Sequence, residues 1–295
     1  MKRRAGYAVL VGRPNVGKST LLNRLLGQKL VITSHKPQTT RHRIVGIKTL
    51  EAGQILYVDT PGLHRRGDKA MNRYLNRTAR TALADVDVVV LVVQALQWSD
   101  EDDAVLAAAR ATGLPLILAV NKVDLVTPRE RLLPYLAEVA AHASFAAVVP
   151  VSAQTGSNCD ALEQEVLARL PEGEDIFPPD QLSDRPERFF AAELLREQVV
   201  RRYHEELPYA VTVEIERFDT DPRGIGIGAV IWVERDNQRR ILIGKGGEAL
   251  KSTASAARQE MIRFFGMPVR LDVWVKVKKS WSSDENSLVR LGYGD

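Results

Sequence analysis

The residues best suited to chemistry lie near the start of the chain, in the run Gly12-Arg13-Pro14-Asn15-Val16-Gly17-Lys18-Ser19. This run matches the pattern G-x-x-x-x-G-K-S, in which glycines let backbone N–H groups curl around phosphates and the lysine reaches the outer phosphates. A serine hydroxyl at its end can bind Mg²⁺, and a helix expected over residues 19–26 points its positive end at the anion. We therefore predict a phosphate site formed by Gly12, Asn15, Val16, Gly17, Lys18, Ser19 and Thr20.

A second motif, Asn121-Lys122-Val123-Asp124, follows an apolar run that has the length of a buried strand. Its aspartate can accept two hydrogen bonds, from the N1–H and the 2-amino group of guanine, and adenine offers no such pair. Further along, Ser152-Ala153 lies where a backbone N–H could meet guanine O6. The motif thus predicts GTP and GDP as ligands, with a base site of Asn121, Lys122, Asp124, Ser152 and Ala153.

Two further segments supply candidate groups for magnesium and the γ-phosphate. The run Asp59-Thr60-Pro61-Gly62 ends a strand, so its aspartate can hold Mg²⁺, usually through water, while the N–H of Gly62 faces the γ-phosphate. The polar run Gln38-Thr39-Thr40-Arg41 is of the kind that becomes an ordered switch when nucleotide and metal are bound. We expect Thr40 to be the ligand there, with Thr39 as the alternative. The predicted magnesium ligands are Ser19, Thr40 and Asp59.

The residue after Gly62 is Leu63, where Ras-like GTPases carry the glutamine that orients the attacking water. Leucine cannot position water by hydrogen bonding, so we expect slow intrinsic hydrolysis and another source of positive charge. Potassium-activated GTPases carry an asparagine at the P-loop position of Asn15, which suggests a K⁺ ion held there. The neighbouring His64 is a minor candidate.

The elements that must position these groups form an alternating series. Short apolar runs, expected to be strands, are separated by segments that fit helices or loops; they cover residues 7–11, 55–59, 86–93, 114–121 and 147–152. This order predicts an α/β domain with a mainly parallel sheet and helices on both faces, in which polar groups follow the carboxyl ends of the strands. We expect a GTPase domain over residues 1–172 and a linker rich in Pro, Asp and Glu over 173–188.

Residues 189–295 form the predicted second domain, which contains a shorter glycine motif. Expected elements follow one another as helix 189–204, strands 209–218 and 227–234, helix 245–265 and strand 269–277. Between the second strand and the second helix stands Gly244-Lys245-Gly246-Gly247, a G-x-x-G loop. In KH domains such a loop packs against about four unpaired nucleotides, because glycine lets the two backbones approach closely. This order predicts a smaller α+β KH domain of the prokaryotic type, with RNA bound by Gly244, Lys245, Gly246, Gly247, Arg239, Arg240 and Lys251.

Composition limits the remaining possibilities. The chain has 295 residues and a net charge of +4, too small for bulk charge to indicate a nucleic-acid binder, so the RNA prediction depends on the local motif. Cys159 is the only cysteine, which excludes an internal disulfide and fits a reducing cytoplasm. The longest apolar runs are far shorter than the ~20 residues of a membrane span.

Taken together, these motifs resemble those of the bacterial Era family of GTPases. The resemblance extends over essentially the whole chain and is carried by GRPNVGKST, PQTTRHRIVGI, YVDTPGLH, NKVD, VSAQTG and the C-terminal LVRLGYGD. It implies a GTPase with a C-terminal KH domain that helps to mature the small ribosomal subunit. It also implies binding near the 3′ end of 16S-type rRNA, a cytoplasmic location and peripheral association with the inner membrane. DNA is not expected as a partner.

Two other functions fit parts of the pattern. In a signalling GTPase the C-terminal domain would bind protein, and the G-x-x-G would be incidental. In an RNA-binding scaffold, nucleotide would serve only folding. The first predicts no affinity for RNA, and the second predicts no turnover.

Overall fold

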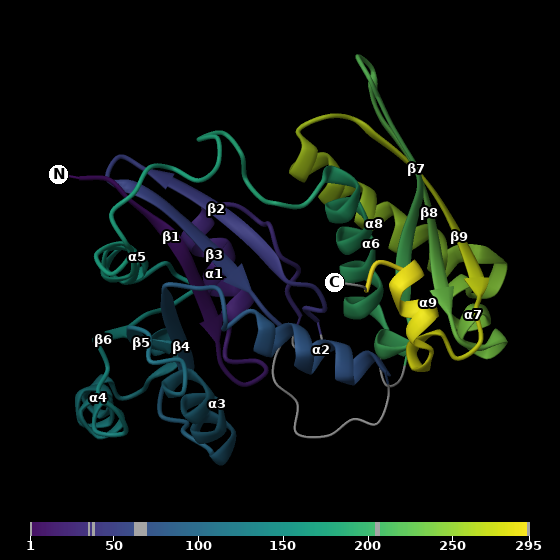
Figure 1. Ribbon diagram of the computed structural model, residues 1–295. Coiled ribbons are helices and arrows are strands. Elements are labelled where there is room, and N and C mark those ends of the chain that lie inside the picture. The colour runs from purple at the N-terminus through teal and green to yellow at the C-terminus, as the bar shows by residue number, and fades with distance from the viewer. Residues whose placement is uncertain (1, 35, 37–38, 62–69, 204–206, 294–295) are drawn as a thin grey trace. The chain divides into compact units, whose positions relative to one another are not determined.

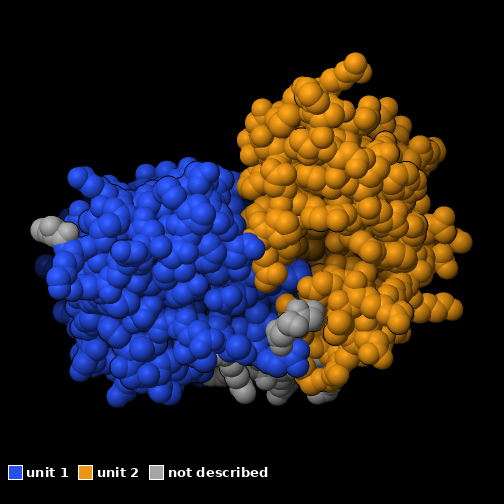
Figure 2. Space-filling model, turned by 45° about the horizontal axis from the view of Figure 1, so that its top comes forward, with its two compact units in different colours: residues 1–65, 75–184 blue, residues 66–74, 185–295 orange. Residues whose placement is uncertain are grey.

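The computed structural model describes residues 2–34, 36, 39–61, 70–203 and 207–293 (Figure 1). The chain divides into two compact units, coloured separately in Figure 2. The first unit comprises residues 1–65 and 75–184, and the second comprises residues 66–74 and 185–295. No helix in the described ranges combines the length and the apolar character that crossing a bilayer requires.

Within the described residues, the first unit is built on a six-stranded sheet with the order β2-β3-β1-β4-β5-β6. All neighbouring strands run parallel except the pair β2 and β3. Because the chain moves from β1 to β3 on one side and to β4 on the other, the order reverses at β1, and such a reversal is where open α/β sheets bind ligands. The strands are β1 (Arg4–Val11), β2 (Ile44–Leu50), β3 (Gly53–Asp59), β4 (Val88–Gln94), β5 (Leu116–Asn121) and β6 (Ala147–Pro150).

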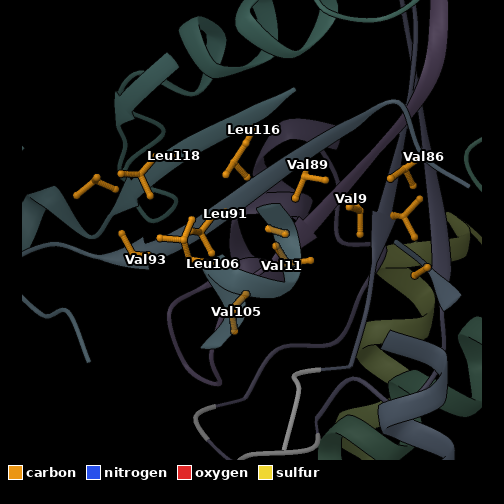
Figure 3. Close-up of a cluster of buried hydrophobic side chains, with 14 of the residues drawn as sticks. Val9, Val11, Val86, Val89, Leu91, Val93, Val105, Leu106, Leu116 and Leu118 are labelled. Carbon is orange, nitrogen blue, oxygen red and sulfur yellow. The ribbon is translucent and has the colours of Figure 1, made fainter. Parts of the chain in front are cut away.

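Helices cover both faces of this sheet (Figure 1). They are α1 (Lys18–Leu26), α3 (Asp100–Arg110), α4 (Leu132–Ala140) and α5 (Cys159–Leu167). Helix α2 (Ala70–Thr81) is divided between the two units, because residues 70–74 belong to the second unit and the rest to the first. On the face covered by α3 and α4, strand residues that include Val11 and Leu91 share one buried apolar cluster with Val105 and Leu106 of α3 (Figure 3). Side chains on both faces of β4 are buried, as expected for a parallel sheet covered on both sides. The predicted α/β fold is confirmed.

Two features of the first unit differ from the sequence-based expectation. Strand β2 was not predicted; it pairs antiparallel with β3 at the edge of the sheet. The predicted linker, 173–188, is irregular as expected but is hydrogen-bonded to the first unit: Ile47 N–H donates to the Leu182 carbonyl at 2.9 Å, and Ser183 Oγ donates to the Val45 carbonyl at 2.7 Å. The last two residues of that segment already belong to a helix. The domain boundaries at 172 and 189 stay predictions.

The second unit is a three-stranded sheet with two long helices on one face. Strands β7 (Thr212–Asp221) and β8 (Gly224–Val233) are antiparallel, and β9 (Val269–Val277) joins β8 in parallel. Alternate apolar residues of these strands pack against α6 (Glu187–Arg202) and α8 (Glu248–Phe265), which gives the unit its own core. This is the predicted KH arrangement with one addition, because the segment before the glycine loop is a helix, α7 (Asp236–Ile243). A short helix, α9 (Glu285–Arg290), lies near the C-terminus.

Candidate functional site

The predicted phosphate loop joins β1 to α1 at the carboxyl end of the sheet. Gly17 ends the loop with a backbone φ of 102°, and a Cβ there would lie 2.3 Å from Nδ2 of Asn121. Any side chain at this position would therefore collide with the base-site motif. Asn15 has a φ of 65°, and its carbonyl accepts a hydrogen bond from Lys122 Nζ at 2.8 Å. Contacts with the base motif thus hold the loop in its curled form.

Lys18 points back into the loop and is buried. Its Nζ donates to the carbonyls of Gly12 at 2.8 Å and Arg13 at 3.0 Å. Burial lowers the pKa of Lys18 to about 8, although the charge of Asp59 opposes the change. Hydrogen bonds to neutral carbonyls do not neutralise the positive charge of this buried ammonium, so binding of an anionic phosphate nearby would be strongly favoured.

Three predicted magnesium ligands from three segments meet beside this lysine. Ser19 Oγ lies 3.2 Å and Thr40 Oγ1 lies 3.1 Å from Oδ2 of Asp59, and the two hydroxyl oxygens are 3.1 Å apart. Thr39, the alternative to Thr40, instead donates to the Lys36 carbonyl at 2.6 Å. The geometry therefore favours Thr40.

The donor set of this cluster fits Mg²⁺, which prefers oxygen ligands and one or two carboxylates. Asp59 is fully buried, and its Oδ1 has no hydrogen-bond partner in the part of the chain that the structure describes. Burial raises the pKa of Asp59 to about 6, against the opposing effects of Lys18 and of the hydrogen bonds from Thr40 and Ser19. A divalent cation would give Oδ1 of Asp59 a partner and would compensate the negative charge of the buried carboxylate.

The base motif begins at the end of β5 with Asn121. Its Nδ2 donates to the Val16 carbonyl at 2.8 Å, and its Oδ1 accepts from the N–H of Ala153 at 3.0 Å. Asn121 therefore ties the phosphate loop to the loop after β6. The sequence left open which backbone N–H of Ser152-Ala153 would meet guanine O6, and the structure shows the Ala153 N–H bonded to Asn121. The Ser152 N–H likewise donates within its own loop, to the Ser157 carbonyl.

Lys122 and Asp124 follow Asn121 directly after the end of β5. Lys122 has a φ of 65°, and its Nζ donates to Gln94 Oε1 at 2.7 Å. Partial burial and the cation of Arg13 lower the pKa of Lys122, whereas Asp124 opposes this. Asp124 lies in a single 3₁₀ turn and is exposed, so its carboxylate is available for a base.

The remaining predicted or candidate site residues add less to this picture. Gly62 lies outside the described residues, as do Leu63 and His64. Thr20 is half-buried in the first turn of α1. The exposed side chain of Asn15 has no hydrogen-bond partner in the described ranges, which leaves its amide oxygen available to an ion.

Sequence reasoning missed one link beneath the phosphate loop. Arg13 Nε donates to Oδ2 of Asp102 at 3.0 Å, and that carboxylate is fully buried in the first turn of α3. Asp102 also accepts from the N–H of Ser99 in a capping box. The S-x-x-D pattern could have identified the cap. Nothing in the sequence connects it with Arg13.

In the second unit, the G-x-x-G loop forms a tight turn between α7 and α8. A Cβ at Gly244 would approach that of Ala249 to 2.6 Å, so the first glycine is required by packing. Gly246 and Gly247 have φ values of 60° and 81°, and a Cβ on either would meet nothing within 4 Å. These two glycines therefore leave an open surface rather than fill a tight contact. Lys245, which lies between Gly244 and Gly246, is exposed.

A groove of about 430 Å³ runs from this loop between α8 and the edge strand β9. Lys251 and Arg258 line its helix wall, and Asp272 and Trp274 line its strand wall. Of the predicted RNA residues, the structure brings Gly247 and Lys251 together in this groove, while Arg239 and Arg240 lie on α7 and do not line it. Arg258 was missed, although it follows Lys251 by seven residues on the same helix face.

The raised pKa of Asp59 predicts how the nucleotide-free protein responds to pH. Because the folded pKa is above the unfolded one, the protonated carboxyl stabilises the fold at low pH, and this contribution is lost as pH rises through about 6. Relative to an Asp59→Asn variant, the wild type should lose about 2 kcal/mol of unfolding free energy between pH 4.5 and 7.5. Urea unfolding of both proteins, without nucleotide or magnesium, measures this difference. Identical pH dependence in the two proteins would contradict the assignment.

Comparisons with known proteins agree with the two units. The model of the family described as 50S ribosome-binding GTPase matches residues 7–122, and that of the KH domain matches residues 206–282. GTPase Era of Pseudomonas aeruginosa is 54% identical over 292 residues, which cover 99% of this chain and 96% of that protein. GTPase Era of Pseudomonas syringae pv. tomato is 52% identical over the same share of this chain and 97% of its own.

Two solved structures are similar over the full length. One is a crystal structure of Era in complex with MgGDPNP and nucleotides 1506–1542 of 16S ribosomal RNA. The other is a variant of Aquifex aeolicus Era bound to GDP and AlF4⁻. Each is 36% identical, has a TM-score of 0.94 and covers 99% of this chain and 100% of its own. With both units matched in sequence and in structure, this chain belongs to the Era family of GTPases.

Proposed function

We propose that this protein is a GTP-hydrolysing switch that binds 16S-type rRNA near its 3′ end and assists maturation of the small ribosomal subunit. The observation that carries this proposal most strongly is the meeting of Ser19, Thr40 and Asp59 beside the buried Lys18. Three segments far apart in sequence supply the oxygen atoms of this cluster, and Lys18 adds an ammonium group beside it. A triphosphate with a bound metal ion requires both, oxygen ligands for the metal and a positive charge for the phosphates.

In this proposal, the phosphate loop binds the nucleotide through its backbone N–H groups and through Lys18. Ser19, Thr40 and Asp59 hold Mg²⁺, which neutralises phosphate charge when bound. Thr40 lies in the segment leading to β2, so loss of the γ-phosphate would release that segment. The cluster thus connects the state of the nucleotide to the conformation of the chain.

The base is selected at the other end of the site. The exposed carboxylate of Asp124 accepts the N1–H and 2-amino hydrogen bonds of guanine. Lys122 flanks it, and its ammonium group is held by hydrogen bonds to Gln94 and Asn15. Asn121 sets the distance between base and phosphates because it bonds to both loops.

RNA binding is proposed for the groove beside the G-x-x-G loop. The cations of Lys251 and Arg258 on one wall suit a phosphate backbone, and the open side of Gly246 and Gly247 admits close approach of another backbone. The Era structure with a 16S rRNA fragment supports this choice over a protein-binding second domain. A cytoplasmic location with peripheral association with the inner membrane is part of the proposal and follows from the family resemblance alone.

Asp124→Asn should weaken GTP binding by about 3–6 kcal/mol, because two hydrogen bonds to a charged acceptor are lost. The same variant should gain affinity for xanthine nucleotides, whose 2-oxo group can accept from the new amide. Calorimetric titration with GDP and with xanthosine diphosphate measures both effects. Glu130→Gln, a neighbouring exposed carboxylate, is the matched control and should bind GDP normally. Unchanged GDP affinity in Asp124→Asn would remove this residue from the site.

Turnover should be faster in KCl than in NaCl of equal ionic strength. We propose that the side chain of Asn15 helps to hold a K⁺ ion whose charge replaces part of what a catalytic glutamine or arginine provides elsewhere. Asn15→Ala should abolish the difference between the salts while GDP affinity stays near that of the wild type. Equal rates in both salts for the wild type would exclude this role.

Gly246→Asp should weaken binding of a single-stranded oligonucleotide matching the 3′ end of 16S rRNA by about tenfold or more, because a carboxylate would face phosphate. Gly246→Asn is the matched control, since asparagine tolerates the same left-handed backbone without a charge. It should bind RNA better than Gly246→Asp, and both should hydrolyse GTP at the wild-type basal rate. A duplex of the same sequence should bind poorly. Wild-type RNA affinity in Gly246→Asp would show that the loop is only a structural turn.

A further inference from the structure

Arg24, near the end of α1, lies against the loop that follows β6. Its Nε donates to the Ala153 carbonyl at 3.1 Å, and its Nη2 donates to the Gln154 carbonyl at 2.6 Å. Helix α1 begins at Lys18 in the phosphate site, whereas the β6 loop belongs to the base site. One guanidinium therefore joins the helix of the phosphate site to two consecutive carbonyls of the base site.

The first of these contacts fixes the orientation of one peptide group. The Ala153 carbonyl and the Gln154 N–H belong to the same planar trans peptide, so they point in opposite directions. When Arg24 holds the carbonyl, the N–H is directed away from α1. A charged donor on the carbonyl also polarises the peptide and makes its N–H a stronger donor.

That N–H stands out within its loop. The N–H groups of the neighbouring residues are all engaged: Ser152 with Ser157, Ala153 with Asn121, Thr155 and Gly156 with Ser152, and Ser157 with Thr155. Over residues 152–157, all of them described, only the N–H of Gln154 has no acceptor in the described structure. Since Asn121 already holds the Ala153 N–H, Gln154 offers the available donor for an exocyclic oxygen.

We propose that Arg24 is a positioning residue for guanine recognition, which orients the 153–154 peptide so that the N–H of Gln154 donates to guanine O6. This inference rests on the guanine site proposed above. It distinguishes guanine from adenine at position 6, where adenine carries an amino group that would meet the N–H donor to donor. Asp124 reads the opposite edge of the base, so the two contacts can be tested separately.

The test compares GDP with 6-thio-GDP, which keeps the N1–H and the 2-amino group but replaces O6 by sulfur, a weak acceptor. Arg24→Met should weaken GDP binding by about three- to tenfold, a modest effect because the guanidinium is exposed to solvent. Binding of 6-thio-GDP should change little, so the preference of the wild type for GDP should shrink. The GDP affinity of Arg24→Lys should fall between those of the wild type and Arg24→Met, since one ammonium cannot reproduce the forked contact with both carbonyls.

Arg110→Met removes an exposed arginine from the end of α3 and is the matched control; its nucleotide preference should equal that of the wild type. Thermal unfolding checks that Arg24→Met is folded. An equal loss of affinity for GDP and 6-thio-GDP in Arg24→Met would overturn the proposal, because Arg24 would then only stabilise the loop. Unchanged GDP affinity would overturn it as well. A wild type that does not distinguish the two nucleotides, yet responds to Asp124→Asn, would overturn this inference and leave the guanine site standing.

Discussion

The side-chain amide of Asn121 donates to the Val16 carbonyl and accepts from the Ala153 N–H, and the geometry of the nucleotide site depends on this pair of bonds. Asn121 ends β5, which is separated from β1 by β4, so the amide must reach across one strand to the phosphate loop. That reach is possible because Gly17 has no side chain: a Cβ there would lie 2.3 Å from Nδ2. The phosphate and base loops therefore share one fixed separation, which suits a ligand that carries both groups.

Charge burial is the second constraint on this site. Lys18 and Asp59 are both buried, and desolvation moves their pKa values towards neutrality, to about 8 and about 6. Each charge is thus poorly compensated by the protein alone. Phosphate and a divalent cation bring the opposite charges, so ligand binding stabilises a site that is costly when it lacks them.

Sequence alone could predict the site residues whose spacing has one physical explanation. Asp59 ends β3, and Ser19 lies just after the loop that follows β1. Because β1 and β3 are parallel neighbours, their carboxyl ends lie at the same edge of the sheet, so the convergence of the two residues could be foreseen. Spacing in the sequence could not decide between Thr39 and Thr40, because adjacent side chains point in different directions. The structure favours Thr40, whose hydroxyl lies beside Asp59, whereas that of Thr39 bonds to the Lys36 carbonyl. The link between Arg13 and Asp102 joins residues 89 positions apart and left no pattern. Strand β2 escaped prediction because its pairing with β3 at a sheet edge depends on tertiary contacts.

The two glycine loops look alike in sequence but differ in what requires their glycines. In the phosphate loop, the protein itself occupies the space that a Cβ at Gly17 would need. In the second unit the same is true of Gly244 against Ala249, but not of Gly246 or Gly247, which face open space. Their backbone angles alone would also admit asparagine. The absence of side chains at both positions, beside a groove lined by Lys251 and Arg258, leaves the space that the proposed RNA site would need for a nucleic-acid backbone.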